Sequence, residues 1–102
     1  MVTSSRKQPL FSLGQVVGTP GALEALAETG QSPLELLTRH QLGDWGQLDE
    51  EDWAQNDESV KDGSRLLSAY HLSNGTKVWI ITEAADEGGA RSATTILLPS
   101  EY

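Results

Sequence analysis

The residues that could do chemistry in this chain are two histidines and a dense group of carboxylates. His40 is followed four positions later by Asp44, and the acids of residues 49–52 come soon after. Imidazole nitrogen and carboxylate oxygen are both common metal ligands. Gly43, however, is expected to end a helix before Asp44, and His71 lies beside aliphatic residues in an expected strand. We therefore predict no metal site and no cofactor, and a structural role for His71.

Other catalytic patterns are missing from the sequence. The chain has no cysteine, no G-x-S-x-G motif for a serine nucleophile and no G-K-[ST] phosphate loop. With 102 residues, of which 37% are hydrophobic, it also has little interior from which to build a catalytic cleft. We therefore expect that the protein is not an enzyme.

Charge argues against a second class of function. Fifteen acidic residues against seven basic ones give a net charge of −8, and the basic residues are scattered. Such a chain repels phosphates, so we expect no direct nucleic-acid binding. No apolar run approaches the ~18 residues of a membrane span, and the N-terminus lacks the long apolar stretch of a secretory signal. The sequence predicts a soluble, cytoplasmic protein without a membrane contact.

The acidic residues are concentrated in one stretch. Residues 44–62 hold eight acids and one base, a local net charge of −7. The acids from Asp49 to Asp52 are expected to occupy the start of a helix, where the helix dipole favours negative charge. Acids in that position are usually solvated and without function, so the stretch alone does not define a binding site.

The element that must position these groups is a β-hairpin centred on Asn74-Gly75. Runs rich in Leu, Val, Ile, Thr, Tyr and Trp flank this pair, which is the strongest short-range hairpin signal. A two-residue type I′ loop would place Tyr70 opposite Trp79. One face of the hairpin would then carry Leu66, Tyr70, Leu72, Trp79 and Ile81. Either another part of the chain covers that face, which would make it core, or it is an interface.

The predicted fold is α+β, with a single domain over residues 10–102 after a flexible tail of residues 1–9. Strands at about 64–72, 76–83 and 93–98 form a three-stranded antiparallel β-meander, with a possible extra N-terminal strand at about 10–17. Three short helices, at about 20–29, 33–42 and 49–62, cover the sheet. The loop from Ala84 to Ser92 is expected to be mobile because of its glycine pair.

Four segments of the chain resemble a known group of proteins. LGQVVGTPGALEAL, SPLELLTRHQLGDWGQLDEED, RLLSAYHLSNGTKVWIITEA and SATTILLPSEY, within residues 10–102, are similar to a family of short uncharacterised bacterial proteins. Members of that family are carried on plasmids and other mobile elements. GDWG and the WIITEA…TTILLP pair are its specific patterns. The resemblance implies a plasmid-related protein but no activity, cofactor or catalytic residue.

We interpret the chain as a non-catalytic protein-interaction or regulatory module of a plasmid or mobile element. Its candidate interaction surface combines Trp45, Tyr70, Trp79, Asp49, Glu50, Glu51 and Asp52. The glycines on both sides of Trp45 favour a presented side chain, and aromatic residues often anchor protein interfaces. The partner would be a protein, and the chain itself a monomer or weak homodimer. The alternative is an acidic DNA mimic that inhibits a DNA-binding or restriction protein.

Overall fold

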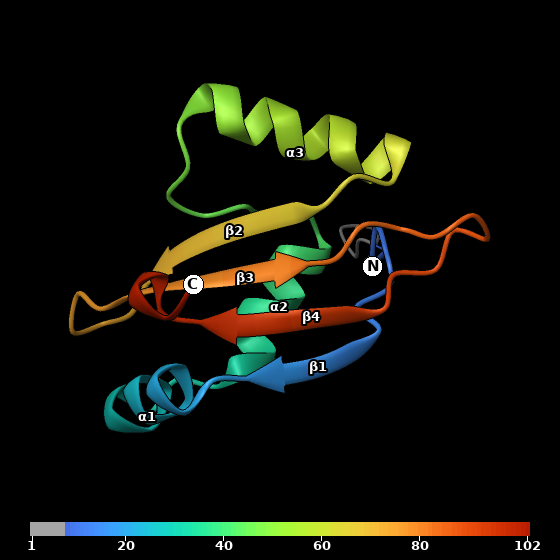
Figure 1. The fold of residues 1–102 in the computed structure, drawn as a ribbon. Coiled ribbons are helices and arrows are strands. Elements are labelled where there is room, and N and C mark those ends of the chain that lie inside the picture. Colours follow the sequence, from blue (N-terminus) through green and yellow to red (C-terminus); the bar gives the residue numbers. More distant parts are fainter. Residues whose placement is uncertain (1–7) are drawn as a thin grey trace, which may run out of the picture.

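A computed structural model describes residues 8–102 as three helices, a short 3₁₀ helix and a four-stranded sheet (Figure 1). The elements are β1 (Gln15–Gly18), α1 (Pro20–Thr29), α2 (Pro33–Gln41), α3 (Glu50–Asp62), β2 (Leu66–His71), β3 (Lys77–Thr82), β4 (Ala93–Leu97) and η1 (Pro99–Glu101). The α+β prediction is confirmed, and each of the three helices lies within one residue of its predicted limits. The predicted tail falls mostly outside the described residues. Within residues 8–102, no helix is long and apolar enough to cross a membrane.

The sheet is mixed, with the strand order β1-β4-β3-β2. The antiparallel meander of β2, β3 and β4 is as predicted, whereas β1 pairs with β4 in parallel. The N-terminal strand, β1, is shorter than the predicted strand at residues 10–17 and begins later in the sequence, at Gln15. The chain bends at Gly14, where φ is +65° and a Cβ atom would lie 2.3 Å from the carbonyl oxygen of Arg91. Strand pairing therefore begins only at Gln15.

The turn between β2 and β3 is one residue longer than predicted. The Leu72 N–H donates to the Thr76 carbonyl, and the Gly75 N–H donates to the Leu72 carbonyl, both at 2.8 Å. Gly75 has a φ of +88°, whereas Asn74 stays at negative φ. This is a type I turn closed by a left-handed glycine, with a three-residue loop.

The longer turn changes the register of the whole hairpin. Tyr70 pairs with Val78, and Trp79 pairs with Ala69. The predicted pairing of Tyr70 with Trp79 is therefore wrong, because a shift of one residue moves a side chain to the other face. The two aromatic side chains lie on opposite faces of the sheet.

Helices α1 and α2 cover one face of the sheet, and the hydrophobic core lies between these two layers (Figure 1). Removing each large aliphatic side chain from water contributes about 1.5–3 kcal/mol to stability. The change of register divides the predicted apolar face: Leu66, Tyr70 and Leu72 lie on the core side of the sheet, whereas Trp79 and Ile81 lie on the opposite side. The core residues are Ala22, Ala25, Leu26, Leu36, Leu37, Tyr70, Leu72, Val78, Ile80 and Ile96.

The C-terminus covers part of the opposite face. The ring of Tyr102 lies edge-on to Trp79, with a centroid distance of 5.7 Å, so Trp79 is only partly exposed. Glu101 fixes this end by accepting hydrogen bonds from the Thr19 hydroxyl and, at 3.2 Å, from the Gly21 N–H. The hydrogen bond from Thr19 is the main reason that the pKa of Glu101 lies below its ordinary value. The C-terminus is therefore tied to the start of α1.

Candidate functional site

Trp45, the residue expected to be presented, is fully buried, so its place in the predicted interaction surface is wrong. Gly43 and Gly46 both have left-handed φ values, of +85° and +80°, and they let the loop fold back on itself. The indole then stacks on Phe11 at 6.2 Å, and its Nε1 donates to Asp57 at 3.0 Å. The flanking glycines turn the side chain inward instead of presenting it.

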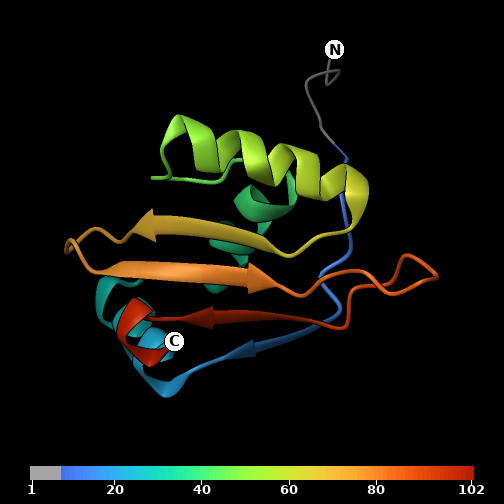
Figure 2. The ribbon, with the colours of Figure 1, turned by 45° about the horizontal axis from the view of Figure 1, so that its top comes forward.

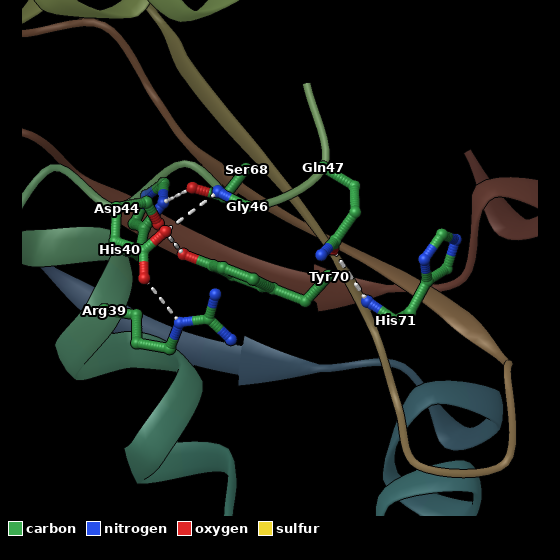
Figure 3. A network of polar contacts seen from close by, with 8 residues as sticks. All are labelled: Arg39, His40, Asp44, Gly46, Gln47, Ser68, Tyr70 and His71. Carbon is green, nitrogen blue, oxygen red and sulfur yellow. Dashed lines mark hydrogen bonds and ion pairs between the residues drawn. The ribbon is translucent and has the colours of Figure 1, made fainter. Parts of the chain in front are cut away.

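The same loop closes the outer edge of β2 (Figure 3). The Ala69 N–H donates to the Trp45 carbonyl at 3.1 Å, and the Gln47 N–H donates to the Ala69 carbonyl at 2.7 Å. The Gln47 side chain accepts from the His71 N–H at 3.1 Å. A Cβ at residue 46 would lie 2.0 Å from the Ala69 carbonyl oxygen, so this close approach requires Gly46.

Tyr70 is likewise buried and belongs to the fold, not to an exposed surface. Its hydroxyl donates to the Asp44 carbonyl at 2.6 Å, and the Arg39 guanidinium lies 4.5 Å from the centre of its ring. Burial raises the pKa of Tyr70 to about 12. Arg39 also donates to the Asp44 carboxylate at 2.7 Å, which raises the pKa of Arg39 (Figure 3).

A buried chain of hydrogen bonds runs from His40 across the sheet. The Thr94 hydroxyl donates to the Leu13 carbonyl at 2.8 Å, so the 2.7 Å contact between Thr82 and Thr94 must use the Thr82 proton. His40 Nε2 therefore donates to Thr82 at 2.9 Å. His40 Nδ1 is then the acceptor of the Ser68 hydroxyl, at 2.5 Å. With these directions, a neutral imidazole gives both nitrogens of His40 and the hydroxyls of Ser68, Thr82 and Thr94 a hydrogen-bond partner.

A serine hydroxyl bonded to a histidine resembles the nucleophile and general base of a hydrolase, but here the Ser68–His40 pair is structural. Both side chains have no exposed surface, so no substrate can reach the Ser68 hydroxyl. Burial, with a smaller effect of the Arg91 charge, lowers the pKa of His40 to about 3. A base with so low a pKa accepts a proton poorly near neutral pH. This pair holds α2 against the sheet.

Arg91 is a buried structural residue that the sequence did not indicate. Its guanidinium donates to the carbonyls of Ser64 at 2.8 Å, Glu83 at 3.0 Å and Ser59 at 3.1 Å. Burial lowers the pKa of Arg91. The Ser64 and Ser59 carbonyls lie 27 and 32 positions before Arg91 in the chain, so no local pattern could have identified this role. Arg91 joins the end of α3 to the loop between β3 and β4.

The acidic half of the predicted surface is exposed. Asp49 caps α3 by accepting from the Asp52 N–H at 2.8 Å, and Glu50 and Glu51 point to solvent in the first turn. The only residues that α3 buries are Asn56 and Ser59. Most of the other side chains of α3 are exposed to solvent.

A groove lies on this exposed side of α3, with a volume of about 310 Å³. Its floor is apolar, and Trp53 and Leu48 in it are each partly exposed. The residues that line it, called the α3 groove below, are Leu48, Glu50, Trp53, Ala54 and Asp57. Trp53, which lines this groove, was not among the residues of the predicted interaction surface.

The fold and this site define an α+β protein with a mixed sheet and an acid-framed groove on its third helix. Within residues 8–102, no three His, Asp or Glu side chains are grouped closely enough to hold a metal ion. No family model matches the chain, and no curated protein or solved structure matches it.

Proposed function

We propose that this protein is a non-catalytic protein-interaction module of a plasmid or other mobile element, and that it binds its partner at the α3 groove. The supporting observation is an apolar groove framed by acidic side chains on a helix that faces solvent. The sequence resemblance to plasmid-borne proteins supports the part of the proposal that places the protein on a plasmid or mobile element. The partner is a protein segment with an apolar side chain between lysines or arginines.

The chemistry of the groove favours this kind of partner. An apolar side chain can displace water from the surfaces of Trp53 and Leu48, and partly buried aromatic residues are frequent anchors of protein interfaces. Glu50 and Asp57 line the groove, and Glu51 lies beside them along the helix. Their negative charge attracts basic side chains, which speeds association and makes it sensitive to salt.

The fold can support such a surface because α3 is held from its other side. Asn56 donates to the Leu67 carbonyl at 2.7 Å and accepts from the Leu67 N–H at 3.2 Å. Asp57 accepts from the Trp45 indole. The two Asn56 bonds fix the helix against β2, whereas Asp57 lines the groove and also bonds to the loop that precedes α3.

The test is an NMR titration with a short peptide that alternates leucine with lysine. We expect amide shifts at Leu48, Glu50 and Trp53. We also expect weaker binding by the Glu50→Gln/Glu51→Gln variant. The control is Glu24→Gln/Glu28→Gln, which changes the net charge equally but on α1, where both side chains are exposed. Equal weakening by the two variants would mean that only total charge matters, and the groove proposal would then be wrong.

Acidic DNA mimicry is the second candidate, because the acids of α3 are exposed along the helix. Ala54→Gln separates the two candidates, since Ala54 is exposed and a longer side chain fills the groove without changing charge. The groove proposal expects weaker binding of the peptide by this variant. A DNA mimic would instead bind a basic DNA-binding protein equally well before and after this substitution, and duplex DNA would compete.

A further inference from the structure

The outer edge of β1 is open. The sheet ends at β1, and no other strand among the described residues pairs with its free side. The Gln15 N–H donates to Ser92 and the Thr19 N–H donates to Ile96, at 3.0 and 2.9 Å, so alternate residues from Gln15 face β4. The N–H and C=O groups of Val16 and Gly18 therefore point outward. An unpaired row of this kind is a template for another strand.

This edge is short, with four residues, but it lacks the charged residues and proline that usually protect an edge strand. Residues 8–23 contain no charged residue, although charged residues make up 22% of the chain. The strand itself contains no proline, and its pairing with β4 is regular. Val16 and Val17 are 43% and 42% exposed, and Leu23, which lies against Gly18, is 47% exposed. Exposed aliphatic side chains thus flank the free backbone groups on both faces of the sheet.

We propose that β1 pairs with β1 of a second copy of this chain, antiparallel and about a two-fold axis at Val17. In this register Val16 of each copy faces Gly18 of the other. Each of these two pairs exchanges two N–H···O=C bonds. The two Val17 side chains meet at the axis, where opposed residues lie closest. Val16 then packs across the partner's Gly18, which has no side chain, toward Leu23 beside it.

The sequence around β1 favours a second copy as the occupant, because it is uncharged and self-complementary. Two chains with a net charge of −8 repel each other over most of their surfaces. They can approach at a strand whose own residues and flanking residues are uncharged. The pattern is also self-complementary, since the valine at position 16 meets the glycine at position 18 in both directions. Four residues bury far less than the ~800 Å² per partner of a standard interface, so the dimer is weak and transient.

The test combines sedimentation velocity with NMR spectra over a dilution series of the full chain. We expect the sedimentation coefficient to rise with concentration, with amide shifts confined to residues 14–19. Added salt should strengthen the association, because it screens the repulsion between copies. Peptide binding at the α3 groove has the opposite salt dependence, so either proposal can fail without the other.

Two substitutions locate the contact. Val17→Lys places two like charges at the axis, and Val16→Pro removes an outward N–H without removing a bond to β4. Both should abolish the rise in sedimentation coefficient while the circular dichroism spectrum stays unchanged. Leu34→Lys is the control, since Leu34 is 69% exposed on α2 and the change in charge is the same as in Val17→Lys. Its association should match that of the unchanged chain.

Three results would overturn the proposal. The chain could stay monomeric at every concentration, which would leave the edge to a strand of another protein. Association could persist in both Val17→Lys and Val16→Pro. Finally, the Val17 methyl groups could give no intermolecular NOE in a mixture of labelled and unlabelled protein that does associate.

Discussion

The two edges of the sheet are treated in opposite ways. Along β2, the Leu67 backbone is bonded by the Asn56 side chain and the Ala69 backbone by the loop at residues 45–47. Along β1, the outward groups of Val16 and Gly18 meet no other strand of the described chain. Figure 2 shows α3 running beside β2, while β1 forms the opposite border of the sheet. One edge is closed by its own chain, and the other is left free.

The difference shows what it takes to close an edge without another strand. A helix cannot continue the backbone hydrogen bonding of a sheet. Instead, α3 supplies one side-chain amide that mimics a peptide group, and the loop supplies a short stretch of backbone. Both devices need particular residues, such as Asn56 and Gly46, at single positions. The closed edge should therefore be sensitive to substitution. The open edge should tolerate substitution, because nothing within the described chain depends on it.

The largest expected effect comes from acid, through His40 behind the closed edge. Its pKa is about 3 in the fold and 6.5 when unfolded, so the unfolded chain takes up the proton more readily. The contribution of neutral His40 to the free energy of unfolding is therefore complete above pH 6.5. It is lost as the pH falls toward 3, by about 1.4 kcal/mol per pH unit. Urea unfolding across this range measures the slope.

The matched control for this prediction is His40→Gln, which removes the titrating group. This variant is expected to be less stable at neutral pH, but its stability should change much less between pH 6.5 and 5. An equally steep loss in the variant would assign the acid sensitivity to carboxylates and not to His40.

Gly46→Ala should break the closed edge. The new Cβ would lie 2.0 Å from the Ala69 carbonyl oxygen at a φ of +80°, so the loop must move and its bonds to β2 are lost. We expect a loss of about 3 kcal/mol in the free energy of unfolding. Gly30→Ala is the control. It has a similar φ of +71° with no atom near the new Cβ, so strain alone should cost it about 1 kcal/mol. Equal losses in urea unfolding would refute the close approach.

Asn56→Ala tests the helix half of the closed edge. Asn56 is 5% exposed, and its amide bonds both the N–H and the C=O of Leu67, which would be left unpaired. We expect a loss of about 2 kcal/mol and faster exchange of the Leu67 amide proton. Gln55→Ala, one position away on the exposed side, should change stability by less than ~0.5 kcal/mol. If Asn56→Ala left the exchange of Leu67 unchanged, the mimicry of a neighbouring strand would be wrong.

Much of the fold could be predicted because its signals are local. Helices α1, α2 and α3 start where Thr19, Ser32 and Asp49 cap them, and each of these side chains accepts a backbone N–H in the structure. The hairpin was also visible at Asn74-Gly75, but its register was not. The same pair fits a two-residue or a three-residue loop, and the choice depends on burying Tyr70 and Val78 on one face.

The candidate site was harder to predict because it depends on distant contacts. Trp45 is buried by Phe11 and Asp57, which lie on either side of it in sequence and far from the glycines that suggested exposure. The pairing of β1 with β4 joins residues about 80 positions apart, and no pattern within Gln15–Gly18 specifies it. The acids of α3 were correctly expected at a helix start, yet the groove beside them also needs Leu48 and Trp53.

The smallest expected effect is at the open edge, and it is the most direct test of the comparison. Val16→Lys introduces a charge on a side chain that is 43% exposed and whose backbone groups face outward. In dilute solution we expect the free energy of unfolding to change by less than ~0.5 kcal/mol. Thermal and urea unfolding of the variant check this. A loss as large as that of Asn56→Ala would mean that β1 also supports the fold, and the contrast between a structural edge and a binding edge would then fail.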